Sequence, residues 1–138
     1  MIINGQDLIL GRLVSYVAKQ AMRGENVDIV NCENVVIVGK KEMIMNEYKE
    51  REEIGSVSKG PFYPKMPDRF VRRVVRGMLP YKESRGKAAF ERVMCYLGVP
   101  DQFKDKKLES VQSAHIENKR TSFITIGELS RIMWGKQV

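Results

Sequence analysis

The first 39 residues, Met1 to Gly39, decide the fold: "MIINGQDLILGRLVSYVAKQAMRGENVDIVNCENVVIVG". "MIIN" is typical of a short buried strand, and apolar residues then recur at helical spacing from Leu10 to Ala21, ahead of Gly24, which suits a helix C-terminus. "NVDIVN" and "VVIVG" are β-branched apolar runs typical of strands covered on both faces, and a helix is the usual crossover between parallel strands. The pattern predicts an α/β domain with a small, mostly parallel sheet.

The chain beyond this unit alternates between helical patterns and one extended loop. Residues 40–53, "KKEMIMNEYKEREE", predict a charged surface helix, whereas residues 55–67, "GSVSKGPFYPKMP", are rich in Gly, Ser and Pro and predict a loop. A helix is expected over 69–79, and Pro80 closes it.

Two more helices are expected toward the C-terminus. Ser84 can cap one that runs to Gly98, with apolar residues along one side. Thr125 stands three residues ahead of Glu128, which is a capping-box spacing and predicts a last short helix.

Length and composition bound the class of protein. A chain of 138 residues with 43% apolar content is long enough for one ordinary domain over 1–138. No run of about 18 apolar residues occurs without a charge, and no basic region precedes the apolar N-terminus, so we expect a cytoplasmic protein without a membrane partner. Cys32 and Cys95 stand far apart with a single histidine in the chain, which predicts reduced core thiols and no metal site.

The charge of the chain is concentrated in one quarter of its length, residues 59–92, called here the basic segment. The net charge of the whole chain is +7. The basic segment holds ten Lys or Arg and three acidic residues, whereas the other 104 residues hold 14 of each sign. A localised excess of this kind predicts a surface that binds a polyanion, with nucleic acid as the leading candidate.

Four arginines of the basic segment share one helix face. At 100° per residue, Arg69, Arg72, Arg73 and Arg76 fall within a stripe about 100° wide, opposite the apolar residues. A solvated face usually mixes signs, because arginines three and four apart repel by a few tenths of a kcal/mol per pair. The unmixed stripe is better explained by phosphates, which guanidinium groups bind bidentately. A lipid surface is the competing partner, but the Val-rich apolar face lies between core-forming segments and is expected to be buried.

The start of the following helix is also cationic. Lys82, Arg85 and Lys87 crowd the positive end of the helix dipole, where carboxylates are normally favoured, and Glu83 alone offsets them. A bound phosphate would turn this unfavourable arrangement into a favourable one, since a helix N-terminus offers free backbone N–H groups.

Several stretches resemble one family. "VRGMLPYKESRGKAAFERVMCYLG", Val75 to Gly98, closely resembles the signature of the universal large-subunit ribosomal protein L-thirteen family, with its Arg-Gly-Met-Leu-Pro core and a second Arg-Gly pair. "LGRLVSYVAK" is similar to the first-helix motif of that family, "VDIVNCENVVIVG" to its second strand region, and "GPFYPKMPDRF" to its archaeal and eukaryotic branch. Val14 and Cys95 depart from the usual residues and suggest altered core packing.

The resemblance implies a three-layer α/β/α fold with a four-stranded, mostly parallel sheet and a basic helical and loop extension. It also implies a structural, non-catalytic role in the ribosome, binding large-subunit rRNA early in subunit assembly beside neighbouring ribosomal proteins. Met78 and Leu79 of the motif are assigned to packing, and Gly77 and Gly86 to close backbone approach. Arg12 is expected to bind either RNA or a carboxylate at the edge of the core. The expected RNA contacts are Arg12, Lys59, Lys65, Arg69, Arg72, Arg73, Arg76, Gly77, Lys82, Arg85, Gly86 and Lys87.

Two other functions compete with the ribosomal role. A nucleotide-binding enzyme would need a glycine-rich phosphate loop, but no GxGxxG occurs, and Asn34 stands where a GxxxxGK[ST] motif ending at Gly39-Lys40 needs glycine. His115 is the only histidine, and neither cysteine has a predictable base partner, so no catalytic residue, cofactor or small-molecule substrate is expected. A free regulator that binds messenger RNA stays open as an alternative.

Overall fold

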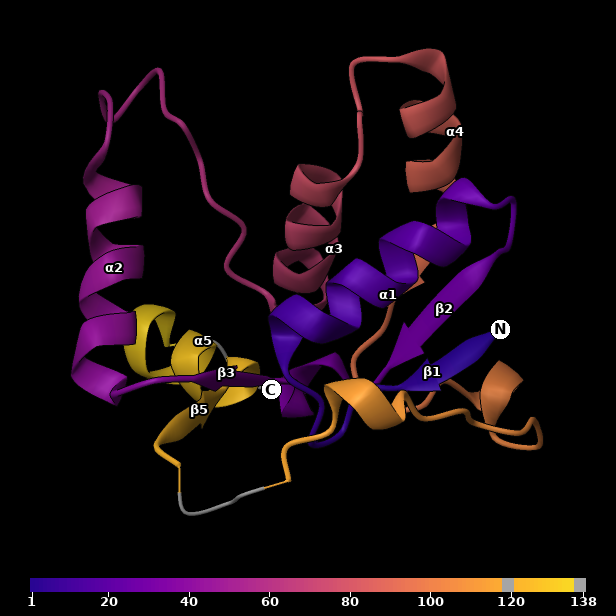
Figure 1. Cartoon of the computed structure of the whole chain (residues 1–138). Helices are drawn as coiled ribbons and strands as arrows, with labels where there is room; N and C mark the ends of the chain where they lie inside the picture. The colour runs from indigo at the N-terminus through magenta and orange to yellow at the C-terminus, as the bar shows by residue number, and fades with distance from the viewer. Residues whose placement is uncertain (118–120, 136–138) are drawn as a thin grey trace.

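The computed structural model of the chain describes residues 1–117 and 121–135 (Figure 1). Three strands form a parallel sheet in the order β1-β2-β4: β1 (Ile2–Asn4), β2 (Val27–Val30) and β4 (Val93–Cys95). The α/β class and the small, mostly parallel sheet are therefore confirmed.

The fourth parallel strand is absent from the part of the chain that the structure describes. The run that was expected to supply it forms β3 (Val36–Val38), which pairs antiparallel with β5 (Phe123–Thr125) in a separate two-stranded sheet. The cause lies directly after β2, where Asn31 takes a left-handed conformation with φ of 55° and a 3₁₀ turn, Cys32–Asn34, follows. Asparagine is one of the few residues that tolerate this conformation, so the chain can turn away from the parallel sheet there.

The first helix crosses the parallel sheet as expected. Helix α1 (Leu10–Met22) buries Leu13, Val14 and Val17 completely and packs against β2, while Gly24 ends the helical segment with φ of 98°. The same helix contacts α3 (Pro67–Met78) and α4 (Ser84–Glu91), so it supports the elements that carry the basic segment.

Helix α2 (Lys41–Glu53) and the following loop stand apart from the parallel sheet, beside α3, in Figure 1. The helix over 40–53 and the extended loop over 55–67 are both confirmed, although Pro67 is already the first residue of α3. Short 3₁₀ turns, Asp101–Phe103 and Gln112–Ala114, lie in the segment between β4 and β5.

The helix that was expected from Ser84 to Gly98 is half as long as predicted. It ends at Glu91, and the residues after it form β4, in which Val93 and Cys95 are buried while Met94 is 43% exposed. Val93 pairs with Val27, so sheet formation with β2 overrides the helical spacing of the apolar residues. Ser84 is the first helical residue, and no side chain caps this helix.

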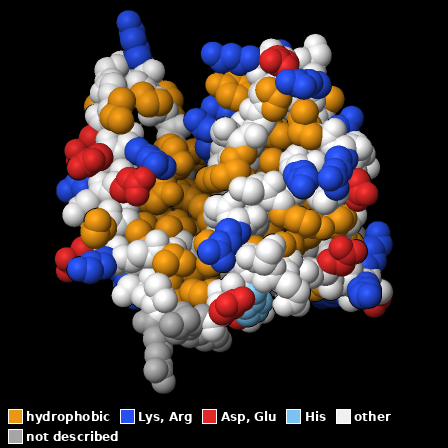
Figure 2. All heavy atoms as spheres, viewed as in Figure 1, with side chains coloured by type: hydrophobic (Ala, Val, Ile, Leu, Met, Phe, Trp, Pro, Cys, Tyr) orange, Lys and Arg blue, Asp and Glu red, His pale blue; other side chains and the backbone are white. Residues whose placement is uncertain are grey.

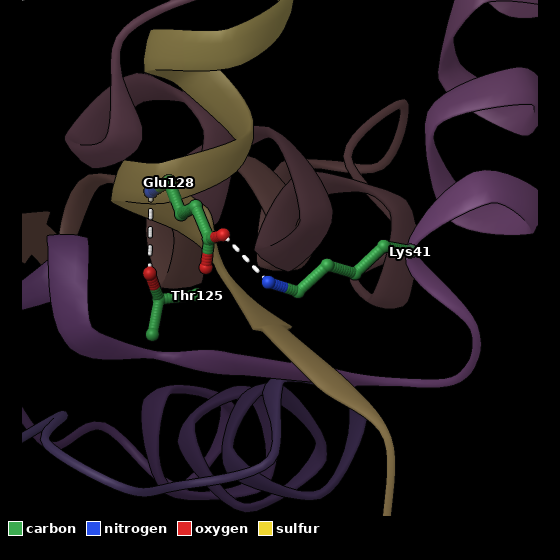
Figure 3. A network of polar contacts seen from close by, with 3 residues as sticks. All are labelled: Lys41, Thr125 and Glu128. Carbon is green, nitrogen blue, oxygen red and sulfur yellow. Dashed lines mark hydrogen bonds and ion pairs between the residues drawn. The ribbon is translucent and has the colours of Figure 1, made fainter.

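The predicted last short helix is confirmed, and the side chain of Thr125 caps its N-terminus. Thr125 precedes α5 (Ile126–Trp134), and its side-chain oxygen accepts a hydrogen bond of 3.2 Å from the backbone N–H of Glu128. The carboxylate of Glu128 forms an ion pair of 2.8 Å with the ammonium group of Lys41, so this side chain ties the start of α5 to the start of α2 (Figure 3).

The two cysteines are neighbours in the core. Cys32 is fully buried and Cys95 is 7% exposed, and the backbone N–H of Cys32 donates to the carbonyl of Tyr96 at 3.2 Å. A hydrogen bond with the Cys95 thiol, and after it burial, raises the pKa of the Cys32 thiol well above its usual range. Both thiols are free, as predicted.

We expect neither thiol to react with iodoacetamide in the folded protein, because both are buried, and the hydrogen bond with Cys95 together with burial disfavours the reactive thiolate at Cys32. Labelling followed by mass spectrometry along a urea titration should show both thiols becoming reactive together at the unfolding transition. Labelling of either cysteine without urea, at the rate of a free thiol, would contradict this packing.

Candidate nucleic-acid interface

Helix α3 carries the arginine stripe and is held to the core by its other face. Pro67 occupies the first turn, where its missing N–H costs nothing, and Phe70, Val71 and Val75 are fully buried. Arg69 is exposed on the opposite side. The alternation follows the predicted angles, so the burial of the apolar face is confirmed.

Arg72 does not belong to the open part of this face. Its Nε donates to the carbonyl of Val93 at 3.0 Å, another guanidinium nitrogen donates to the carbonyl of Phe90 at 3.4 Å, and the guanidinium carbon lies 3.9 Å from the Phe90 ring centroid. These contacts tie α3 to the junction of α4 and β4. The expected stripe of four outward-facing arginines is therefore corrected to three, with Arg72 as a structural neighbour.

The other three arginines lack carboxylate partners among the described residues. Neither Arg69 nor Arg73 takes part in an ion pair or a side-chain hydrogen bond within 1–117 and 121–135. The guanidinium carbon of Arg76 lies 4.8 Å from the Tyr81 ring centroid, while its buried Nε has no hydrogen-bond partner. Burying such a donor unpaired costs about 1–3 kcal/mol.

These side chains form a shallow groove along α3, called here the arginine groove. It has a volume of about 280 Å³ and is lined by Pro64, Arg69, Arg72, Arg73, Arg76 and Phe90. Figure 2 shows Lys and Arg side chains gathered along the upper edge of the molecule, over the connection between α3 and α4. The groove and this edge both carry cations of the basic segment.

The cations at the start of α4 extend that surface. Lys82, Arg85 and Lys87 are all exposed, as predicted. Arg85 forms an ion pair of 2.7 Å with Glu83, and both side chains are more than half exposed, so solvent screens this pair strongly. An anionic partner can therefore compete for Arg85.

The two motif glycines have different surroundings. A Cβ on Gly86 would lie 1.8 Å from the carbonyl oxygen of Pro80, so this glycine permits close packing of the chain on itself. A Cβ on Gly77 would meet only a nitrogen of Arg73, at 3.9 Å. A partner can therefore approach the backbone closely at Gly77. At Gly86 the backbone of Pro80 already occupies the space beside the α-carbon.

The two apolar residues of the motif also differ. Leu79 is buried at 5% exposure, which confirms its assignment to packing. Met78 is 45% exposed, so only part of its side chain is available for packing. Its sulfur lies 3.5 Å from the hydroxyl oxygen of Ser15, an exposed residue of α1.

Three further candidate cations lie outside the arginine groove. Arg12 is exposed on α1 and forms no ion pair within the described part of the chain, so the structure gives no support for a carboxylate partner there. Lys59 is exposed in the loop after α2, and Lys65 forms a 3.7 Å ion pair with Glu52. None of these three residues lines the arginine groove.

The sequence pattern of the family described as Ribosomal protein L13 matches residues 1–102 of this chain, which include the whole basic segment. The chain belongs to this ribosomal protein family. It is 44% identical over 137 residues to the large ribosomal subunit protein uL13 of Methanosarcina barkeri, an alignment that covers 98% of both chains. It is also 40% identical over 134 residues to uL13 of Archaeoglobus fulgidus, covering 96% of this chain and 86% of that one.

Residues 1–117 and 121–135 hold neither a cluster of metal-ligating side chains nor a helix that could span a membrane. Within those residues no three His, Cys, Asp or Glu side chains are grouped so that they could hold a metal ion. No helix there is both long enough and apolar enough to cross a membrane.

Two structural contributions were not predicted from the sequence. Arg92 donates to the carbonyl of Ala21 at 2.9 Å and so satisfies the C-terminal end of α1. Tyr81 and Phe90 each place a ring under a guanidinium group of α3. An aromatic residue shortly after an arginine-rich helix is the only sequence signal that could have indicated the second of these.

Proposed function

We propose that this protein is a non-catalytic structural component of the large ribosomal subunit, in the cytoplasm, which binds large-subunit rRNA and supports early subunit assembly. Its partners are that rRNA and neighbouring large-subunit proteins. The observation that carries the proposal is the set of three guanidinium groups on α3, Arg69, Arg73 and Arg76, that no carboxylate of the described chain opposes. The relatives, which are large ribosomal subunit proteins uL13, support the same assignment.

The geometry favours recognition of the RNA backbone. Guanidinium groups on one helix face, followed by the cations at the start of α4, suit phosphates spaced along a folded RNA strand. The major groove of an RNA helix is too narrow for side chains to read, so recognition by shape and backbone is the usual mode. We therefore propose selectivity for a folded rRNA junction over a short linear sequence.

The test is co-sedimentation of the tagged protein with large ribosomal subunits through a sucrose gradient at high salt. An assembled structural component should stay with the subunit, because it is held by many contacts made during assembly as well as by exposed charges. A protein found in the free fraction even at low salt, and bound instead to messenger RNA, would replace this proposal with the regulator alternative.

A further inference from the structure

A second, larger groove lies on the other side of α3. It has a volume of about 550 Å³, and residues from α1, α2, α3 and the loop after α2 line it. Figure 2 shows a hollow between the column of α2 and the body of the molecule, with apolar side chains along its walls and cationic side chains near it. We call it the tyrosine groove, and the residues that matter most are Gly11, Tyr48, Arg51, Tyr63, Arg73 and Gly77.

One wall of the tyrosine groove is a rigid aromatic cluster. The ring centroids of Tyr48 and Tyr63 lie 5.9 Å apart, and Phe70 packs behind them at 5.1 Å and 5.7 Å. Phe70 and Tyr48 are buried, whereas Tyr63 keeps part of its surface exposed. The cluster therefore holds a partly accessible ring in a fixed position, as a stacking surface requires.

Guanidinium groups stand on both sides of this wall. Arg51 lies with its guanidinium carbon 4.9 Å from the Tyr48 ring centroid and pairs with Glu47 at 2.6 Å. Arg73 has no carboxylate partner in the described part of the chain, and it lines both the tyrosine groove and the arginine groove. A polyanion lying along the arginine groove would thus pass the mouth of the tyrosine groove at Arg73.

The two glycines of the tyrosine groove point to an occupant. Gly11 and Gly77 are helical residues that do not adopt positive φ, so the backbone does not need glycine at either position. A Cβ on Gly11 would meet nothing within 4 Å, and one on Gly77 would meet only the Arg73 nitrogen at 3.9 Å. Glycine weakens a helix relative to alanine. Its presence at two open positions beside one groove is explained if a ligand approaches the backbone there.

We propose that the tyrosine groove receives one unstacked nucleotide of the bound RNA, with its base against Tyr63 and its phosphate on Arg73; this inference rests on the proposed function. Bases that leave the helix in loops and bulges are commonly stacked on aromatic side chains, while arginine binds the adjacent phosphate. An apolar segment of a neighbouring protein fits less well, because it would bury the unpaired charge of Arg73 without a counter-charge.

The test compares two RNA duplexes of about 16 base pairs, one fully paired and one with a single bulged 2-aminopurine nucleotide. The wild-type protein should bind the bulged duplex more tightly by roughly 5- to 150-fold, which is the range that stacking of one base on an aromatic side chain gives. Stacking against Tyr63 should also quench the fluorescence of the bulged base.

Gly11→Leu fills the tyrosine groove from α1 without touching the arginine groove. It should abolish the preference for the bulged duplex and the quenching, keep the affinity for the paired duplex, and raise the melting temperature, because leucine favours a helix more than glycine does. Tyr63→Leu should also abolish the quenching, because it removes the ring on which the base stacks. Gln112→Leu, which places the same side chain at an exposed position away from α3, should leave the preference intact.

The outcomes separate the two proposals. Equal wild-type affinity for both duplexes overturns the nucleotide site while leaving RNA binding through the arginine groove supported. A preference that survives in Gly11→Leu also overturns it, because the base then lies elsewhere. Failure to bind either duplex overturns the nucleotide site, and failure to bind a folded fragment of large-subunit rRNA as well contradicts the proposed function itself.

Discussion

Replacing Gly86 with alanine should destabilise the folded protein by about 3–5 kcal/mol, among the largest effects expected of a single substitution. A Cβ at this position would lie 1.8 Å from the carbonyl oxygen of Pro80, 2.2 Å from its carbonyl carbon and 2.9 Å from the backbone nitrogen of Tyr81. All three atoms belong to the backbone, so no side-chain rotation relieves the clash. The turn between α3 and α4 has to open instead.

The measurement is the free energy of unfolding from urea titrations, with Gly77→Ala as the matched control. Gly77 is also helical and belongs to the same sequence motif, but its added Cβ would meet only a side-chain nitrogen at 3.9 Å. Alanine there should stabilise the protein by up to about 1 kcal/mol, since glycine costs that much in a helix. Similar effects of the two substitutions would show that Gly86 is not packed against Pro80 in this way.

The order of elements in the first half of the chain could be predicted because local patterns decide it. The helical spacing from Leu10 to Ala21 predicts a helix, and the β-branched runs around it predict strands. The partner of each strand could not be predicted in the same way. Val36–Val38 looks as apolar as Val27–Val30, and the conformation of Asn31 separates them into different sheets.

The length of α4 was mispredicted for a related reason. The apolar residues from Ala89 to Leu97 fit a helix face, but those from Val93 to Cys95 also fit a short strand with alternate burial. Periodicity cannot distinguish the two in so short a segment. Pairing with β2 decides between them, and that contact spans more than 60 residues of sequence.

In the candidate site too, local spacing could be predicted from the sequence, whereas contacts between elements could not. Angular spacing predicted that Arg69, Arg73 and Arg76 share a face, because a helix fixes their directions. It could not predict that Arg72 donates hydrogen bonds to carbonyls of α4 and β4. Nor could it predict that Gly86 lies against the backbone of Pro80 while Gly77 has free space beside its α-carbon. Those differences depend on contacts between elements that only the folded chain brings together.

Affinity for a duplex-containing fragment of large-subunit rRNA should fall about 10³- to 10⁵-fold between 50 and 200 mM salt, if six to ten phosphates are neutralised. The reason is the release of counterions from the RNA when Lys and Arg replace them. The excess of positive charge that drives this lies within the basic segment, residues 59–92. Filter binding or fluorescence anisotropy over a series of salt concentrations measures it. A flat response would contradict binding through phosphates.

Arg69 and Arg73 are the best pair for testing which cations are responsible. They are one helical turn apart and carry no carboxylate partner in the described chain, so changing both to Gln should leave stability unchanged or raise it by a few tenths of a kcal/mol. Each phosphate contact contributes about 0.7–0.9 to the slope of log affinity against log salt, so the double variant should lose roughly 1.4–1.8 units. Arg72 is excluded from the pair because its loss would also break contacts to Phe90 and Val93.

The control is the double change of Lys106 and Lys107 to Gln, because both are exposed cations in the mixed-sign segment "DQFKDKKLES". If position on α3 matters, this control should change the slope little, although it removes the same number of charges. Equal losses in the two double variants would mean that net charge alone attracts the RNA. No loss in either would mean that the polyanion lies on neither surface, and the arginine groove would then need another explanation for three guanidinium groups held on one face without a carboxylate.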